Sequence, residues 1–385
     1  MRHVSDDERR ARLATRQALA PASRLGSPEA VAAAMTALHA TEPPTVHLSC
    51  WARVPGFEIA DVDRALHRDK TLVKQLAMRR TLFAFPRDLL PAVWASASAR
   101  VAGQERAKIA KEVLAAGLTT DADAWVDRAR EQVLAVLSDA PGGLQAAELR
   151  AAVPMIDQRT GHSTGGTYLA TNVIVYLGAR GDVVRGLNSG GWRVSRPQWT
   201  TNAHWLGAPP PGVGAAQGYR ELVGRWLRTF GPGTEDDVVW WLGATKAIVR
   251  AALADLDAVR VSLDGGGTGW LLPDDLDEVA DPGHWVALLP TLDPTVMGWR
   301  GRDFYLGPHG PQLFDRAGNA VTTAWVDGRI VGCWVQDEAG VVRVRLLADV
   351  PAAARRELDA EAARLTEWLG GERVTIRYRA PAVLG

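Results

Sequence analysis

The stretch TLVKQLAMRRTLFAFP, residues 71–86, holds two β-rich runs around a short basic turn and predicts a two-stranded hairpin. Helical patterns precede it at about residues 27–40, 46–53 and 59–67. The pair Pro43-Pro44 ends the first of these helices, because the residue before a proline avoids the α region. Three helices followed by a hairpin are the pattern of a winged helix.

The same order of elements recurs twice along the chain, which indicates a repeat of architecture rather than of sequence. The second copy covers residues 121–195 and the third covers residues 216–272. Their turns fall at Asn188-Ser189-Gly190-Gly191 and between Asp264 and Gly267, where the residues tolerate a positive φ angle. The helices predicted for these two copies span residues 121–137, 144–152, 167–177, 216–229, 235–242 and 245–256.

Beyond residue 282 the pattern changes to short apolar strands joined by turns. A helix is predicted over residues 352–369, and RVTIRY at residues 373–378 predicts a final strand. We interpret this part as a small β-barrel-like domain. The predicted fold class is therefore α+β, mostly α, with tandem winged-helix repeats followed by a C-terminal β-barrel-like domain. The predicted domains are residues 1–117, 118–205, 206–282 and 283–385.

The composition is that of a globular protein, with 47% hydrophobic and 23% charged residues among 385. No apolar run is long enough to cross a membrane, and the first residues contain no apolar segment typical of a secretory signal. Cys50 and Cys333 are too few for a disulfide framework or a zinc cluster. We therefore expect a cytoplasmic protein without a metal, a cofactor or a membrane partner, and the DNA binding considered next would make it nucleoid-associated.

The local distribution of charged residues favours a DNA partner more than the net charge does. The net charge is zero, which by itself argues against a nucleic-acid partner. Residues 68–112, however, hold ten Lys/Arg against four Asp/Glu, a local balance of +6. We expect the predicted hairpin to contact DNA, since basic hairpins can enter the minor groove. The residues expected to bind are Lys74, Arg79, Arg80, Thr81 and Arg87. The alternative is a basic hairpin that contacts no ligand.

Two predicted recognition helices add polar residues to this list of candidates. Thr171 and Asn172 lie early in the helix at residues 167–177, and Lys246 and Arg250 lie four residues apart in the helix at residues 245–256. These side chains either contact DNA or remain solvated.

The whole chain resembles the AlkZ/YcaQ-like winged-helix DNA glycosylases of bacteria. The resemblance is carried by residues 38–86, by the block Trp51-Ala52-Arg53, by Met78, Arg79 and Thr81, and by Leu288-Leu289-Pro290 with Asp293. It implies a monofunctional, monomeric enzyme that hydrolyses the N-glycosidic bond of alkylated purines or of crosslinked bases in damaged duplex DNA. The family's catalytic motif is Gln-x-Gln or Gln-x-Asp at the end of the second helix. Here the corresponding positions read His39-Ala40-Thr41.

The chemistry of the lesion suggests how these residues could serve. An N3- or N7-alkylated purine is already cationic and leaves without a strong general acid. What remains is to activate a water molecule and to stabilise a cationic sugar. His39 can accept a proton from that water, because imidazole titrates near neutrality, and the hydroxyl of Thr41 can hold it. Glu42 and Asp293 are candidate carboxylates for the sugar, and Asp293 is preferred because the resemblance includes it.

Other interpretations remain open at this point. His39 can simply be a residue at a helix C-terminus, where it favours the helix dipole, and Thr41 a loop residue. The chain can then be a non-catalytic winged-helix DNA-binding protein, regulatory or lesion-shielding. A scaffold for protein partners also fits the zero net charge. Loss of DNA cleavage in His39→Ala, with DNA binding retained, would distinguish the enzyme from the non-catalytic DNA-binding protein. A protein scaffold should show no salt-dependent DNA binding at all.

Overall fold

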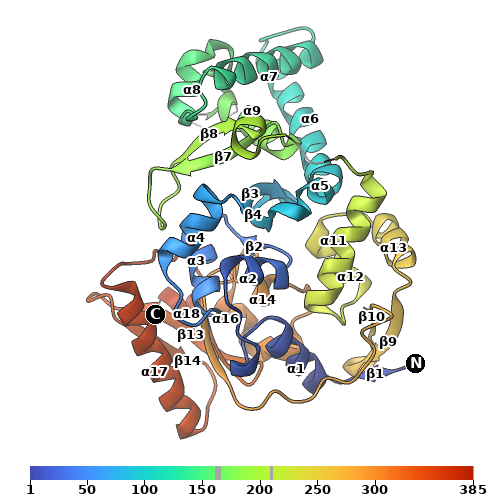
Figure 1. Ribbon diagram of the computed structural model, residues 1–385, viewed down its shortest axis with the longest axis vertical. Helices are drawn as coiled ribbons and strands as arrows, with labels where there is room; N and C mark the ends of the chain where they lie inside the picture. The colour runs from blue at the N-terminus through green and yellow to red at the C-terminus, as the bar shows by residue number, and fades with distance from the viewer. Residues whose placement is uncertain (161–165, 209–210, 385) are drawn as a thin grey trace. The chain divides into compact units, whose positions relative to one another are not determined.

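The computed structural model describes residues 1–160, 166–208 and 211–384. The chain forms two compact units (Figure 1). One contains Met1–Ala65 and Arg220–Gly385, and the other contains Leu66–Tyr219. The boundary near Ala65 falls inside the segment predicted as residues 1–117, so the first unit is discontinuous along the chain. The finer division into four segments stays a prediction.

The first helices of the discontinuous unit begin at the caps that the sequence indicates. The Ser5 hydroxyl accepts the amide N–H of Glu8, and acidic residues fill the first turn of α1 (Asp6–Arg16), where the helix dipole is positive. Ser27 caps α2 (Pro28–Ala34) in the same way. Helix α2 ends earlier than residue 40, the end expected from the apolar pattern.

The early end of α2 has a tertiary cause. The Thr229 hydroxyl donates to the carbonyl oxygen of Ala34 at 2.7 Å and accepts from the Thr36 hydroxyl at 2.9 Å. Thr36 then takes a left-handed conformation, with φ 65°, and the chain enters the short strand β2 (Leu38–His39). The expectation that His39 ends a helix is therefore wrong, because a partner distant in sequence ends that helix first.

The third predicted copy has the expected order of elements. It consists of α11 (Ala215–Phe230), α12 (Glu235–Leu242), α13 (Lys246–Asp255), β9 (Val259–Leu263) and β10 (Thr268–Leu271). The turn between the strands uses Gly265 and Gly266, both with positive φ. The sequence did not predict β1 (His3–Val4), which pairs in parallel with β9 at the N-terminus (Figure 1). The identity of the copies as winged helices stays a prediction.

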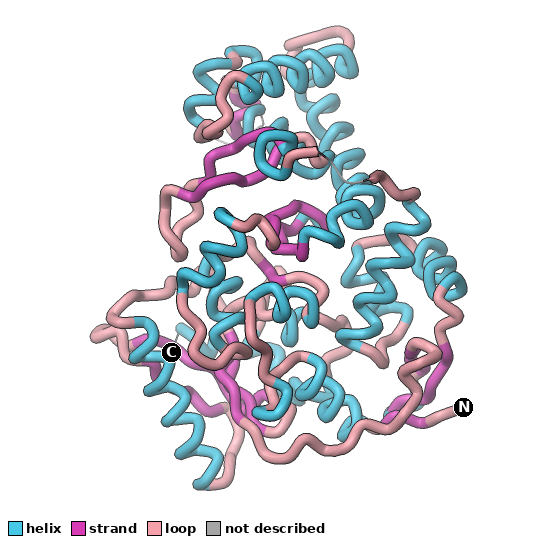
Figure 2. The backbone as a smooth tube through the Cα atoms, viewed as in Figure 1, coloured by secondary structure: helices cyan, strands magenta, loops and turns pink. Residues whose placement is uncertain are grey.

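The C-terminal region contains an open sheet. Four antiparallel strands follow the order β11 (Val286–Leu289), β12 (Thr323–Val326), β13 (Arg329–Gln336) and β14 (Val342–Leu346), and α17 (Ala352–Leu369) packs on β11 and β14. Figure 2 shows the strands of the chain as small, separate sheets. No closed barrel forms among the described residues, so the β-barrel-like prediction is wrong.

The predicted strand at residues 373–378 is also absent from this sheet. The side chain of Gln336, at the end of β13, binds this segment instead. Its amide nitrogen donates to the carbonyl oxygen of Glu372, and its amide oxygen accepts from the backbone N–H of Val374. These two bonds attach the segment to the end of β13, and residues 373–378 run as an irregular chain.

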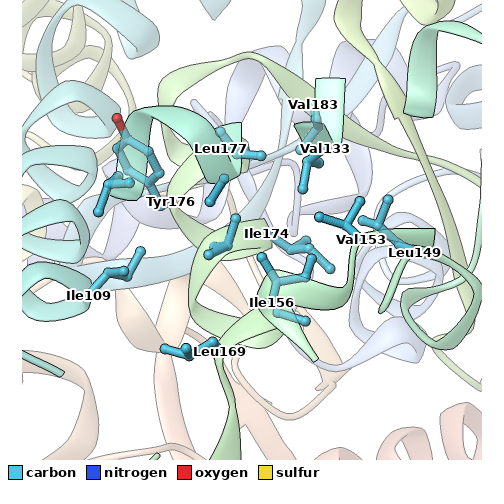
Figure 3. Packing of buried hydrophobic residues seen from close by; sticks show 14 of the residues in the cluster. Ile109, Val133, Leu149, Val153, Ile156, Leu169, Ile174, Tyr176, Leu177 and Val183 are labelled. Atoms are coloured by element: carbon cyan, nitrogen blue, oxygen red, sulfur yellow. The ribbon is translucent and has the colours of Figure 1, made fainter. Parts of the chain in front are cut away.

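The second unit packs around one apolar core. Side chains from α6 (Ala99–Ala115), α7 (Ala122–Ser138), α8 (Ala146–Ala152) and α9 (Leu169–Arg180) converge there, as Figure 3 shows for Ile109, Val133, Leu149 and Ile174. The predicted hairpin is confirmed as β3 (Leu72–Ala77) and β4 (Thr81–Pro86), and a second one forms from β7 (Val183–Asn188) and β8 (Pro197–Thr201). No helix of the described residues is long and apolar enough to cross a membrane.

An exposed histidine links three parts of the C-terminal region and makes stability depend on pH. His284 Nδ1 lies 2.9 Å from the Asp327 carboxylate, and Nε2 lies 3.1 Å from that of Glu357 on α17. The hydrogen bond with Asp327, and the charges of both carboxylates, raise the pKa of His284 above its ordinary value. A raised pKa in the folded state contributes stability below the unfolded pKa of about 6.5, and this is lost as pH rises through the folded pKa.

We therefore predict that His284→Gln lowers the free energy of unfolding more at pH 6 than at pH 9. The loss should stay below about 1 kcal/mol, because the pairs are solvent-exposed. Urea titrations at the two pH values measure it. His204→Ala, which changes an exposed histidine of the other unit, is the control. An equal loss at both pH values would contradict the electrostatic origin.

Candidate functional site

The segment 39–42 joins β2 to α3 (Pro43–Trp51) and holds the candidate catalytic residues. The His39 side chain is buried, with 5% of its surface exposed, whereas Thr41 is exposed to solvent. Glu42 is the N-cap residue of α3, and Pro43 takes the first helical position, where a missing N–H costs nothing. The motif thus holds a buried imidazole, whose two ring nitrogens do not reach solvent, and an exposed hydroxyl two residues later, next to a carboxylate.

A fully buried ion pair anchors the far end of α3. Arg53 Nη2 lies 2.7 Å from Asp293 Oδ1, and Nη1 lies 2.9 Å from Oδ2, so the pair is bidentate. The Ser49 hydroxyl donates to Oδ2 at 2.6 Å, and the Thr295 N–H donates to Oδ1 at 3.0 Å. Arg53 also donates from Nε to the carbonyl oxygen of Gln17 at 2.9 Å. Burial alone would raise the pKa of Asp293, but Arg53 and the two other donors hold it below its usual range.

A second bond fixes the start of the same helix. The Thr45 hydroxyl, in the first turn of α3, donates to the carbonyl oxygen of Thr291 at 2.8 Å. Asp293 follows two residues later as the N-cap of α14 (Pro294–Met297). The segment 291–293 therefore holds α3 at both of its ends. This arrangement explains why Arg53 and Asp293, the residues that carry the resemblance, occur together.

The surroundings of Asp293 bear on its expected catalytic role. No part of its side chain reaches solvent, and both carboxylate oxygens accept hydrogen bonds inside the protein. A carboxylate in this position supports α3 and does not face a surface where a sugar could bind. Its direct contact with substrate stays a prediction, and the structure favours a supporting role.

Glu42, the second candidate carboxylate, is held by the C-terminal segment. Its Oε2 lies 3.2 Å from Arg377 Nε, and the Tyr378 hydroxyl hydrogen-bonds to it. Burial raises the pKa of Glu42, while the charge of Arg377 and the bond from Tyr378 act in the opposite direction. Sequence reasoning missed Arg377 and Tyr378, because no local pattern connects residues from opposite ends of the chain.

The five residues expected to bind DNA lie on or beside the β3–β4 hairpin of the second unit. Lys74 is half-buried within β3, and Arg79 is exposed at the turn, with φ 52°. Arg80 is also exposed, but it pairs with the buried carboxylate of Glu105 at 2.5 Å, which offsets part of its charge. Thr81 begins β4, and Arg87 follows it with a bond to the carbonyl oxygen of Leu206. Arg79, Arg80 and Arg87 are therefore the exposed cations among these five residues, and Arg80 is paired with a carboxylate.

Three of the four polar candidates on the two predicted recognition helices, namely Asn172, Lys246 and Arg250, bind other residues of the protein. Asn172 is buried, donates to Glu112 at 2.7 Å and accepts from Lys108 at 3.2 Å, so it is not available to contact DNA. Lys246 pairs with Asp236 at 2.8 Å, and Arg250 forms a bidentate pair with Glu235. Thr171 remains exposed.

The β7–β8 hairpin is a candidate DNA-contacting element that sequence reasoning missed. Its strands and loop carry Arg185, Arg193 and Arg196, and no acidic residue occurs between Asp182 and Glu221. Leu187 and Val194 are among the most exposed large apolar residues, with 50% and 41% of their surface accessible. The run without acidic residues was visible in the sequence and could have indicated this hairpin.

The described residues do not indicate metal chemistry. No group of three or more His, Cys, Asp or Glu residues in the described parts of the chain is arranged to hold a metal ion. The thiols of Cys50 and Cys333 are buried, and burial raises the pKa of Cys333 to about 11, which makes a reactive thiolate unfavourable at neutral pH. The chemistry available at segment 39–42 is therefore that of an imidazole, a hydroxyl and a carboxylate.

Comparisons with known proteins agree with this architecture. The family described as DNA glycosylase AlkZ-like matches residues 32–368. Among solved structures, the DNA glycosylase AlkZ of Streptomyces sahachiroi superposes with a TM-score of 0.76 at 21% sequence identity, over 98% of this chain and 100% of that chain. This second likeness concerns the fold. No curated protein sequence matches the chain.

The anchoring of α3 can be tested through stability. We predict that Asp293→Asn or Arg53→Met alone lowers the free energy of unfolding by about 3–5 kcal/mol, because each leaves a buried partner without its counter-charge. Urea-induced unfolding measures the change. Arg355→Ala, which breaks the exposed pair with Asp359, is the control and should cost less than about 1 kcal/mol. A cost that small for Asp293→Asn would show that the buried pair does not anchor the helix.

Proposed function

This chain belongs to the family of AlkZ-like DNA glycosylases, and on that premise we propose that it hydrolyses the N-glycosidic bond of N3- or N7-alkylated purines, or of related bulky or crosslinked adducts, in duplex DNA. The observation that carries the proposal is segment 39–42. It holds an imidazole at the end of β2 and a hydroxyl two residues before α3, a helix that is anchored by Thr45–Thr291 and Arg53–Asp293.

The reaction is a hydrolysis in which the leaving base already carries a positive charge. The bond from C1′ to the purine nitrogen breaks, its electron pair neutralises the base, and positive charge develops on the sugar. The oxygen of a water molecule then bonds to C1′ and loses a proton. His39 accepts that proton in its neutral form, which is the dominant form of an ordinary imidazole above pH 6.5. The products are an abasic site and the free alkylated base.

Thr41 places the nucleophile. Its hydroxyl donates one hydrogen bond and accepts others, so it can orient a water molecule in the exposed part of the segment. Asp293 enters the proposal as the residue that holds Arg53 and α3. We propose that the enzyme is a monomer, is monofunctional and uses no metal, so the hydrolysis relies on these side chains and water. If the protein binds damaged DNA at this site but does not cleave the glycosidic bond, it is a lesion-binding protein, and the cleavage experiment distinguishes the two.

DNA binding is assigned to the basic hairpin. Lys74, Arg79, Arg80, Thr81 and Arg87 are proposed to contact the phosphate backbone, and the side chains of Arg79, Arg80 and Arg87 are exposed. Contacts of this kind release counterions, so the affinity should fall steeply as salt rises.

The cleavage proposal is tested with duplex oligonucleotides that carry N7-methylguanine. We expect the wild type to produce abasic sites that hot alkali converts to strand breaks. His39→Ala should slow cleavage by about 10²–10⁴-fold, as the loss of a general base does, with Kd for DNA unchanged. His204→Ala is the matched control. Binding without cleavage by the wild type would favour the lesion-binding alternative, and retained cleavage in His39→Ala would remove His39 from the mechanism.

The hairpin proposal is tested by the salt dependence of binding. Arg79→Ala should weaken binding and lower the slope of log K against log salt by about 0.9, the value of one phosphate contact on duplex DNA. Fluorescence anisotropy from 50 to 200 mM salt measures it. Arg250→Ala, which removes an exposed arginine already paired with Glu235, is the control. An unchanged slope in Arg79→Ala would place the DNA elsewhere.

A further inference from the structure

Glu42 occupies a position that helix capping does not explain. It is the N-cap residue of α3, but its side chain makes no hydrogen bond to the first turn. Ser, Thr, Asp and Asn are the residues preferred there, because their short side chains reach the free N–H groups. Pro43 and Pro44 remove two of those groups from α3. The carboxylate of Glu42 therefore finds few free N–H groups in the first turn of α3, and it binds a different partner.

That partner is the C-terminal segment. Arg377 and Tyr378 are adjacent in sequence, and both bind the one carboxylate, which leaves 13% of the Glu42 side chain exposed. The Tyr378 hydroxyl stays protonated at neutral pH and donates, because burial, followed by the charges of Glu42 and Asp315, raises its pKa to about 12. The Arg377 side chain is itself 63% exposed, so this pair lies at the protein surface rather than in the core.

The position of Glu42 along the chain fits a role in the reaction. It follows Thr41 directly, so the two Cα atoms lie about 3.8 Å apart. The other candidate carboxylate, Asp293, has no exposed surface, since both it and its partner Arg53 are fully buried. Glu42 is thus the carboxylate of this segment that combines partial exposure with a fixed side-chain position.

We propose that Glu42 is the catalytic carboxylate that stabilises the positive charge developing on the sugar, and that Arg377 and Tyr378 are positioning residues that hold it beside Thr41. This inference rests on the proposed glycosylase function. It assigns the C-terminal segment to the active site, and it fits cationic alkylated nucleosides as the substrate class, because a carboxylate favours a positively charged reactant. Glu42 acts in its ionised form, so its contribution falls when it is protonated.

The pH dependence of cleavage separates this role from a structural one. Single-turnover rates on N7-methylguanine are measured between pH 4.5 and 9 with saturating enzyme. Because the proposal requires both His39 and Glu42 in their unprotonated forms, the logarithm of the wild-type rate should fall with decreasing pH, with a slope of one while one of the two groups is protonated and a slope of two once both are. Glu42→Gln should be slower by about 10²-fold near neutral pH, as for the loss of one electrostatic contact, and should keep a slope of one throughout.

The positioning residues give a second, independent readout. In Arg377→Ala the pKa of Glu42 rises, because the charge that opposes burial is gone, so the change from slope one to slope two should move to higher pH. Tyr378→Phe should move it in the same direction by less. Arg379→Ala, an exposed arginine of the same segment, is the control and should leave the profile unchanged.

The outcomes are distinguishable. Wild-type rates and slopes in Glu42→Gln, with cleavage still abolished by His39→Ala, would overturn the role of Glu42 and leave the proposed function intact. A shifted profile in Arg377→Ala with full DNA binding would support the inference even if Glu42→Gln failed to fold. No cleavage by the wild type would contradict the proposed function and this role of Glu42 together.

Discussion

The buried ion pair between Arg53 and Asp293 is the interaction on which the candidate site depends. Two charges without solvent contact are costly unless their remaining hydrogen-bonding groups are satisfied. Here Ser49, Thr295 and the backbone of Gln17 satisfy them, so the end of α1, the end of α3 and the start of α14 meet at one point. Because α3 is fixed there and at Thr45, the segment before it has a defined position. The flexibility of an exposed loop is thus removed from the residues proposed to bind water.

The zero net charge is compatible with DNA binding because the charges are distributed unevenly. On α12 and α13, Lys246 and Arg250 are matched by acidic partners, and these ion pairs reduce the field that a phosphate would experience. The β7–β8 region carries arginines and no acidic residue. Affinity for a polyanion follows the local field more than the sum over the chain, so the composition alone was a poor guide to the partner.

The sequence predicted the elements whose signals are local. Helix starts at Ser27, Asp121 and Thr234 follow from capping residues whose side chains accept a first-turn N–H, and the glycine turn between β9 and β10 follows from positive φ angles. Three features depended on distant partners and were not predictable. Thr229 ends α2 early, β1 joins β9, and the Gln336 side chain holds the segment that was expected to be a strand.

The same distinction holds for the candidate site. His39, Thr41 and Asp293 were identified from the sequence through a resemblance, and Glu42 was considered beside them, but the ranking of the two carboxylates required burial and partners. Asp293 is one of the residues that carry the resemblance, and for that reason it was preferred; the structure shows that it lies in a fully buried ion pair with Arg53. A residue that supports a site and a residue that acts in it give the same signal in a sequence.

The chemistry of a cationic leaving group explains why a site of this composition would suffice. In the proposed reaction the alkylated base departs as a neutral molecule, so no acid is needed to protonate it, and the protein has only to activate the nucleophile and to stabilise the charge on the sugar. A neutral imidazole and a hydroxyl serve the first need, and a carboxylate serves the second. On this account the replacement of the family's glutamine by His39 adds a group that can accept the proton of the attacking water, which an amide side chain does poorly. The difference between His39-Ala40-Thr41 and a glutamine-containing motif should then affect the pH dependence of the cleavage rate more directly than it affects which lesion is cleaved.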